Sequence, residues 1–134
     1  MPRIIDIEGV GQFYAQKLQA IGIRTTERLL KVAGAKRGRQ DLAQQTGISE
    51  KLILEWVNLS DLMRIKGVGE EYSDLLEEAG VDSVKELRNR VPANLHQKLL
   101  ETNKVKKLVR RVPSFKEVRR WVQEAKVIPP VVTH

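Results

Sequence analysis

The sequence predicts an all-α protein built from two consecutive four-helix units, and three observations support this. No segment alternates polar and apolar residues with the period of two that a half-buried β-strand needs. Apolar residues recur at helical spacing in short runs, and glycines separate these runs along the 134 residues. The phrase Ile7-Glu8-Gly9-Val10-Gly11 returns 58 residues later as Ile65-Lys66-Gly67-Val68-Gly69. An internal repeat with one unit per copy accounts for all three.

The repeat continues beyond the glycines. At the same offset of 58 residues, five further positions match, because Tyr14, Leu18, Gly22, Ile23 and Leu29 correspond to Tyr72, Leu76, Gly80, Val81 and Leu87. Later in each unit the offset becomes 65, since Ser49 and Trp56 correspond to Ser114 and Trp121. The second unit therefore carries an insertion of seven residues, which we place within residues 103–113.

The first unit covers residues 1–63, and its helices are expected at residues 11–21, 26–33 and 39–46 and after Ser49. Glycines at positions 22, 34 and 47 follow three of these helices, as glycine commonly does at a helix C-terminus. Thr25 or Thr26 caps the second helix, and Ser49 caps the fourth. We interpret the basic residues 36–39 as a connection leading into the third helix.

The second unit covers residues 64–126 and repeats this plan. Its first helix is expected at residues 70–79, and capping boxes at Ser83–Glu86 and Ser114–Glu117 begin the second and fourth. Pro92 ends the second helix, and Asn94 can cap the third. Residues 127–134 contain two consecutive prolines and are predicted to form an extended tail.

Composition limits the classes of function. The chain has no cysteine, which excludes disulfides, thiolate metal sites and cysteine nucleophiles. No apolar run approaches the ~18 residues of a membrane span, and the first residues lack the apolar segment of a signal peptide. We therefore expect a cytoplasmic protein with no membrane partner.

The net charge of +7 is concentrated in the C-terminal third of the chain. Residues 1–89 contain 13 Lys/Arg and 14 Asp/Glu, whereas residues 90–134 contain 11 Lys/Arg and 3 Asp/Glu. This asymmetry points to a polyanionic partner, with nucleic acid ahead of a membrane surface. The alternative is a solvated basic face that serves solubility.

Each glycine turn precedes an amphipathic run, so the free N–H groups of a helix N-terminus lie beside it. Such an N-terminus can hold an anion such as a phosphate, and glycine allows close approach to the backbone. The alternative is a tight turn that only lets two helices pack closely. The sequence leaves both interpretations open.

The order of these motifs resembles a tandem helix-hairpin-helix domain of the SAM-like type. The resemblance rests on Ile7-Glu8-Gly9-Val10-Gly11, on the Leu-x-x-x-Gly-Ile-x-Thr pattern of residues 18–25, and on Thr46-Gly47-Ile48-Ser49. Similar units occur in archaeal and eukaryotic recombinases and in bacterial transcription proteins. More narrowly, the chain is similar to an uncharacterised bacterial family with two such units. The resemblance covers nearly all of residues 7–126. It implies the fold, and it implies either phosphate contacts through hairpin N–H groups or protein binding.

We predict nucleic-acid contacts at the two glycine turns and at two basic groups. The predicted residues are Gly9, Val10, Gly11, Lys36, Arg37, Arg39, Gly67, Val68, Gly69, Lys104, Lys106, Lys107, Arg110, Arg111, Lys116, Arg119 and Arg120. The basic stretch from Lys104 to Arg120 is the strongest candidate. If Val105, Leu108, Val109 and Val112 face inward, its charged side chains crowd the outer face.

The predicted function is non-enzymatic binding of DNA or RNA through the phosphate backbone, with little sequence specificity. The alternative is a protein–protein interaction or adaptor module, suggested by Glu70 and Glu71 beside the second glycine turn. No pattern of nucleophile, metal ligands or Walker loop supports an enzyme, and no cofactor is expected. Because they hold equivalent positions, Trp56 and Trp121 are interpreted as core anchors rather than base-stacking residues, as are the equivalent tyrosines.

Overall fold

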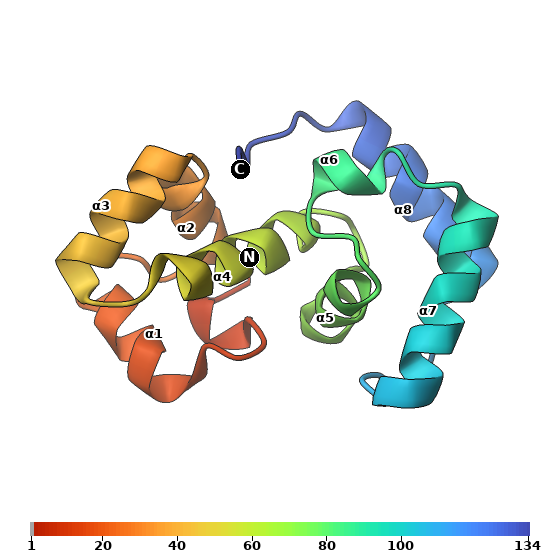
Figure 1. Ribbon diagram of the computed structural model, residues 1–134, viewed down its shortest axis with the longest axis horizontal. Coiled ribbons are helices and arrows are strands. Elements are labelled where there is room, and N and C mark those ends of the chain that lie inside the picture. Colours follow the sequence, from red (N-terminus) through yellow and green to blue (C-terminus); the bar gives the residue numbers. More distant parts are fainter. Residues whose placement is uncertain (1) are drawn as a thin grey trace. The chain divides into compact units, whose positions relative to one another are not determined.

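The computed structural model describes residues 2–134, and this range contains eight α-helices and no β-strand (Figure 1). The helices are α1 (Gly11–Gln19), α2 (Thr26–Ala33), α3 (Lys36–Thr46), α4 (Glu50–Leu62), α5 (Glu70–Glu78), α6 (Val84–Leu87), α7 (Pro92–Lys106) and α8 (Phe115–Val127). A short 3-10 helix, η1 (Ile4–Asp6), precedes them. The prediction of an all-α protein is confirmed.

The chain divides into two compact units. Unit 1 comprises Met1–Asp61 together with Val131–His134, and unit 2 comprises Leu62–Pro130. The boundary between them falls between Asp61 and Leu62, in the last turn of α4. The sequence analysis placed it between residues 63 and 64. The residues predicted as a tail are divided, because Val127 ends α8 and Val131–His134 belong to unit 1.

Unit 1 packs around the apolar face of α4. Trp56 of α4 is 1% exposed, and its ring centroid lies 5.2 Å from that of Tyr14 on α1, with 55° between the ring planes. Leucines on three other helices complete the buried layer, and Leu18, Leu29 and Leu42 are each at most 1% exposed. The first four helices thus share one small core.

Unit 2 packs around the corresponding face of α8. Trp121 is fully buried, and its ring centroid lies 5.3 Å from that of Tyr72 on α5, with 52° between the planes. Leu76, Leu87 and Leu99 of three different helices join the same core. The prediction that both tryptophans are core anchors is confirmed, and the two Tyr–Trp pairs have nearly the same geometry.

Two helices begin earlier than the sequence suggested. α3 begins at Lys36, so the expected basic connection is its first turn. Gly38 lets this first part of α3 pack closely against α2, because a Cβ atom there would lie 2.0 Å from the carbonyl oxygen of Val32 on α2. α7 begins at Pro92 rather than after an Asn94 cap. Proline suits the first helical position, where its φ is already helical and no N–H is needed.

The last residues, Val131–His134, form a tail segment that packs on unit 1 through Arg39. The Arg39 side chain donates hydrogen bonds to the carbonyl oxygens of Ala33 at 3.1 Å and Gly34 at 2.8 Å. It also donates to the carbonyl oxygen of Thr133 at 2.6 Å, while the Thr133 N–H donates to the Gly34 oxygen at 3.0 Å. Arg39 is therefore a buried clip between the end of α2 and the tail segment.

Candidate nucleic-acid interface

The glycine turn at residues 9–11 presents only backbone to a ligand. Val10 is 2% exposed, and its N–H donates to the carbonyl oxygen of Ile7 at 3.2 Å. Gly9 and Gly11 have φ values of 85° and 67°, and a Cβ atom at either would meet no other atom within 4 Å. Glycine is required here because of backbone conformation, not because of a close neighbour.

A carboxylate lies directly before the glycine turn at residues 67–69. Both carboxylate oxygens of Glu124, on α8, accept the N–H of Lys66 at 3.2 Å. The side chain of Val68 is buried, and two glutamates begin α5 directly after the turn. Because the Glu124 carboxylate lies just before this turn and two glutamates follow it, the turn suits a phosphate less well than the turn at residues 9–11.

Gly67 lies directly against α8. Its φ is 88°, and a Cβ atom there would lie 3.1 Å from Nη2 of Arg120 and 3.6 Å from Nε1 of Trp121. Glycine at this position thus lets the turn approach the Arg120 guanidinium, which remains exposed. The structure brings Gly67 and Arg120, both predicted contact residues, together.

The three basic residues at the start of α3, Lys36, Arg37 and Arg39, do not form one exposed surface. Arg39 is 4% exposed, and burial lowers the pKa of its guanidinium, an effect that the charge of Glu50 opposes. Its guanidinium N–H groups donate to backbone carbonyl oxygens, so Arg39 has a structural role. The prediction that Arg39 contacts nucleic acid was therefore wrong. Arg37 is exposed and pairs with Asp41, with 3.6 Å between Nε and Oδ1. Lys36 is exposed at the start of the helix.

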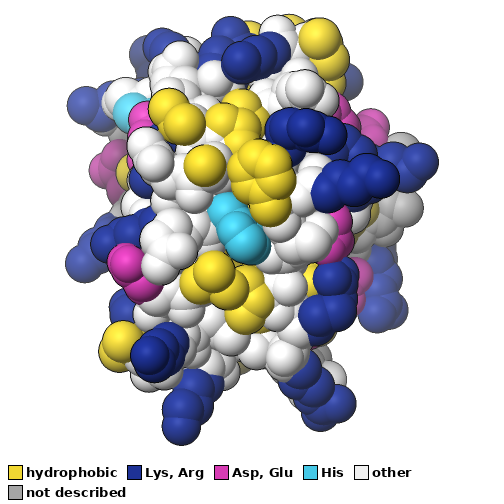
Figure 2. All heavy atoms as spheres, turned by 90° about the vertical axis from the view of Figure 1, so that its right-hand side faces the viewer, with side chains coloured by type: hydrophobic (Ala, Val, Ile, Leu, Met, Phe, Trp, Pro, Cys, Tyr) yellow, Lys and Arg dark blue, Asp and Glu magenta, His cyan; other side chains and the backbone are white. Residues whose placement is uncertain are grey.

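The basic stretch from Lys104 to Arg120 covers the end of α7, the connection that follows it, and the first half of α8. Figure 2 shows this side of the molecule, with Lys and Arg side chains projecting around its edges. Val109 is 8% exposed, but Val105 is 81% exposed and does not face inward as expected. The reason is that α7 continues to residue 106, which places Val105 about 120° around the helix from the buried Leu99.

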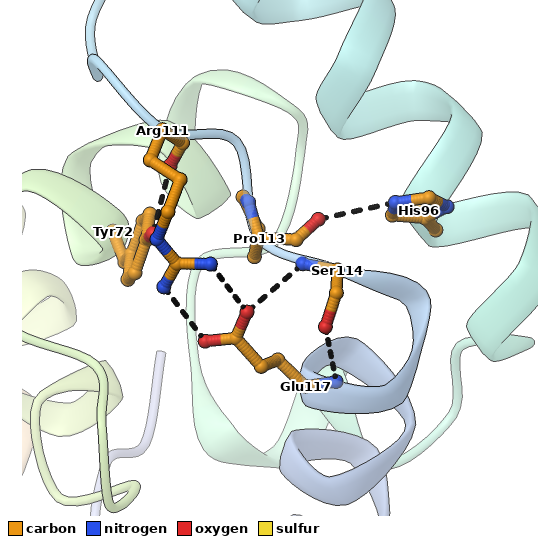
Figure 3. Close-up of polar contacts among 6 residues, drawn as sticks. All are labelled: Tyr72, His96, Arg111, Pro113, Ser114 and Glu117. Atoms are coloured by element: carbon orange, nitrogen blue, oxygen red, sulfur yellow. Dashed lines mark hydrogen bonds and ion pairs between the residues drawn. The ribbon is translucent and has the colours of Figure 1, made fainter.

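Carboxylates already neutralise two cations of the stretch. Lys106 forms an ion pair and hydrogen bond with Glu78, which raises the pKa of the Lys106 ammonium group. Arg111 donates two hydrogen bonds to Glu117, at 2.8 and 3.0 Å (Figure 3). This fork, helped by the N–H of Ser114, lowers the pKa of Glu117 to about 2. Both cations are thus partly committed within the protein.

Hydrogen bonds around Arg111 and Glu117 fix the connection between α7 and α8. The Tyr72 hydroxyl donates to the carbonyl oxygen of Arg111 at 2.7 Å. Ser114 and Glu117 form a capping box, because the Ser114 N–H donates to Oε1 at 3.0 Å and the Glu117 N–H donates to Oγ at 3.2 Å. These bonds hold the backbone around Arg111 in one position, as Figure 3 shows.

Six cations of the stretch are exposed and form no ion pair within residues 2–134. They are Lys104, Lys107, Arg110, Lys116, Arg119 and Arg120, and we call them the free cations. Three of them belong to a row on the outer face of α8 that continues through Gln123 to Lys126. A hollow beside this row is lined by Ser114, Lys116, Glu117, Arg119, Arg120 and Gln123. The sequence prediction omitted Gln123 and Lys126, although their helical spacing was a signal for them.

Arg110 and Arg111 line a second hollow, together with Gly69, Glu70, Glu71 and Tyr72. The end of the second glycine turn therefore lies beside the connection between α7 and α8. Two arginines and two glutamates face this hollow, so its net charge is close to zero. The other five free cations, on α8 and at the end of α7, are not among the residues that line this hollow.

The part of the chain that the structure describes contains no cluster of His, Cys, Asp or Glu that could hold a metal ion. Within the same residues, no helix is both long enough and apolar enough to cross a bilayer.

The fold and this surface define an all-helical protein of two units with an exposed row of cations on one of them. Residues 8–128 match the family described as Domain of unknown function (DUF4332), and the chain belongs to this family. Curated proteins and solved structures gave no match.

Proposed function

We propose that the protein is a non-enzymatic nucleic-acid-binding protein that contacts the phosphate backbone through the free cations of unit 2. The observation that carries this proposal is that six neighbouring cations stay exposed while the nearby carboxylates pair elsewhere. A cation without a carboxylate partner can replace the counterions of a nucleic acid, and the release of these ions drives binding.

We also infer that the two units are copies of one helix-hairpin-helix plan. The matching Tyr–Trp pairs support this inference, since their centroid distances are 5.2 and 5.3 Å. The first glycine of each turn supports it too, with φ values of 85° for Gly9 and 88° for Gly67. The phosphate contacts nevertheless fall mainly on unit 2, because the free cations lie there.

The proposed binding has little sequence specificity. The contact groups are flexible Lys and Arg side chains on a helix face and a connection, and phosphate contacts of this kind carry no base information. The net charge favours unit 2 as the unit that contacts phosphate. Unit 2 holds 15 Lys/Arg and 10 Asp/Glu, a net of +5, whereas unit 1 holds 9 and 7, a net of +2.

Fluorescence anisotropy with labelled DNA and RNA at about 50 and 200 mM salt tests this proposal, because phosphate contacts weaken steeply over that range. The informative variant changes Lys116, Arg119 and Arg120 to alanine. The matched control changes Arg24, Arg28 and Lys31 of unit 1, which are equally exposed and remove the same charge.

The α8 variant should bind more weakly and should reduce the slope of log K against log salt by about 2 to 3, whereas the control keeps the slope. Equal losses in the two variants would show that net charge alone attracts the ligand and would contradict a defined surface. If no strand binds at the lower salt, the proposal fails and the protein-interaction alternative, with Glu70 and Glu71 as its exposed acidic contacts, takes its place.

A further inference from the structure

The chain has only two phenylalanines, and both are exposed. Phe13 is 66% exposed and Phe115 is 42% exposed, whereas Trp56 and Trp121 are at most 1% exposed. Phenylalanine is among the residues most often found inside proteins. The cores of both units are thus built without phenylalanine, and the two phenylalanine rings are left at the surface.

Phe115 is held in place by polar and aromatic neighbours on one side. The ring of His96 on α7 lies edge-on to it, with 6.1 Å between ring centroids and 69° between planes. His96 is itself fixed by a hydrogen bond of 3.1 Å between Nε2 and the carbonyl oxygen of Pro113. The guanidinium carbon of Arg119 lies 6.0 Å from the Phe115 ring centroid. The ring is therefore positioned by its surroundings and still reaches solvent.

Hydrophobic side chains form a strip on this side of the molecule, with a histidine side chain within it and Lys and Arg side chains at its edges (Figure 2). Phe115, Leu100 and Val105 are the exposed large hydrophobic residues of the last two turns of α7 and the first turn of α8. Lys116 and Arg119, which are free cations, are close neighbours of Phe115 along α8. An apolar flat ring thus lies among cations that have no carboxylate partner.

Phe13 repeats this combination in unit 1. It lies in the first turn of α1, directly after the glycine turn at residues 9–11. Nζ of Lys17 lies 5.1 Å from its ring centroid, and the Tyr14 ring packs against its edge at 5.3 Å. Each unit therefore presents one exposed ring with a cation beside it, although the two rings come from helices that are not equivalent in the repeat.

We propose that the ligand is single-stranded nucleic acid and that Phe115, with Phe13 as a second platform, stacks on its unpaired bases. This inference rests on the proposed function, because the free cations supply the phosphate contacts. In a duplex the base faces are already stacked on one another, whereas a single strand offers them to an aromatic ring. A cation beside such a ring can contact the neighbouring phosphate, so ring and charge bind one nucleotide together.

Three ligands of about 16 nucleotides separate stacking from charge: a single strand, its duplex, and an abasic single strand with the same phosphates. Anisotropy titrations would use the full chain with Phe115→Leu, Phe115→Tyr and Val91→Ala. Tyrosine keeps the ring and leucine keeps only an apolar side chain. Val91, which is 57% exposed on the same unit, is the matched apolar control. Thermal unfolding followed by circular dichroism checks that each variant is folded.

We expect Phe115→Leu to weaken binding of the base-containing single strand about tenfold, which is typical for the loss of one stacked base. Phe115→Tyr and Val91→Ala should bind like the wild type, and binding of the abasic strand should not change in Phe115→Leu. Phe13→Leu should give a smaller loss, because the free cations all belong to unit 2 and Phe13 belongs to unit 1.

Equal affinity for the base-containing and abasic strands would overturn the stacking inference and leave phosphate binding intact. Tighter binding of the duplex, with no effect of Phe115→Leu, would overturn it in the same way. Absence of binding to all three ligands would remove the proposed function as well. Binding of a Glu-rich peptide with apolar residues, without binding of any strand, would instead assign the strip to a protein partner.

Discussion

The two units connect their last two helices in different ways. In unit 1, α3 ends at Thr46 and is followed by Gly47, which has a φ of 76°; a single residue separates Gly47 from Ser49 before α4. In unit 2, α7 ends at Lys106 and is followed by Lys107, which has a φ of 52°; residues 108–113 separate Lys107 from Ser114. Unit 1 thus joins its last two helices by a tight glycine turn, whereas unit 2 joins them by a longer basic connection.

Under the proposal that the two units are copies of one plan, this difference gives the two copies different surfaces. Both units keep the Tyr–Trp pair and the buried face of the last helix, so their cores are alike. The longer connection adds Arg110 and Arg111 and is tied to α5 by the Tyr72 hydroxyl. The two units therefore have the same aromatic pair in the core and differ in the connection before the last helix.

The largest effect is expected from removing the tryptophan of either unit. Trp56→Ala and Trp121→Ala should each lower the free energy of unfolding by about 3–5 kcal/mol, because each leaves a large cavity in a small core. Since the two side chains are equally buried, the two losses should be similar. Urea unfolding followed by circular dichroism measures both, and a negligible loss in one unit would show that the cores are not equivalent.

The next largest effect concerns the tail segment, which belongs to unit 1. Arg39→Ala should cost about 2–3 kcal/mol, because it leaves the carbonyl oxygens of Ala33, Gly34 and Thr133 without their charged donor. Hydrogen exchange of the Thr133 amide should become faster. The control Arg37→Ala should change stability by less than about 0.5 kcal/mol, as exposed residues usually do. Slow exchange at Thr133 in Arg39→Ala would contradict the role of the clip.

A smaller effect is expected from the helix ends themselves. Lys107→Gly should raise the free energy of unfolding by about 1 kcal/mol, because glycine adopts the left-handed conformation without the steric cost that lysine bears. Gly47→Ala should lower it by about the same amount. Lys107→Ala removes the charge but keeps the strain, so it separates the two effects. Equal stability of Lys107→Gly and Lys107→Ala would contradict this explanation.

The smallest effect is a pH dependence confined to unit 2. The pKa of Glu117 is about 2 in the folded protein and 4.5 for an ordinary glutamate, chiefly because Arg111 donates hydrogen bonds to it. The folded state thus binds this proton less readily, so the contribution of Glu117 is complete above pH 4.5 and is lost as the pH falls towards 2. The advantage of the wild type over Glu117→Gln should disappear across that window in unfolding measurements made at a series of pH values.

Unit 1 offers the control, because Leu52 occupies the third position after its cap, Ser49. The Leu52 N–H donates to the Ser49 Oγ at 3.2 Å, without a carboxylate to complete the box. Leu52→Ala should therefore change stability by the same amount at every pH in this range. A constant difference between wild type and Glu117→Gln would show that the Arg111 fork adds nothing.

The sequence predicted the features that repeat. The offset of 58 residues located both glycine turns, and the offset of 65 matched Trp56 with Trp121, which proved to pair with the corresponding tyrosines, Tyr14 and Tyr72. Such features are local patterns of apolar residues and glycines, and a pattern can be recognised from spacing alone. The start of α7 was missed because Pro92 was taken as the end of a helix, although it also suits the beginning of one.

What the sequence could not predict are the partners of charged residues. Arg39 looked like a member of a surface cluster, but its partners include Thr133, which is 94 residues away. Lys106 pairs with Glu78, 28 residues earlier in the chain. These contacts depend on which helices pack together. A run of charged residues has no periodicity from which that packing could be predicted. The free cations could therefore be identified only after the paired ones were known.

We propose that the ligand contacts unit 2 along α8 and the connection before it. The most direct measurement is a set of amide chemical-shift changes recorded while a short single-stranded oligonucleotide is added to the ¹⁵N-labelled protein at low salt. We expect the largest changes within residues 107–120 and little change at residues 26–46 of unit 1. Unchanged signals at residues 107–120, with or without changes elsewhere, would contradict it.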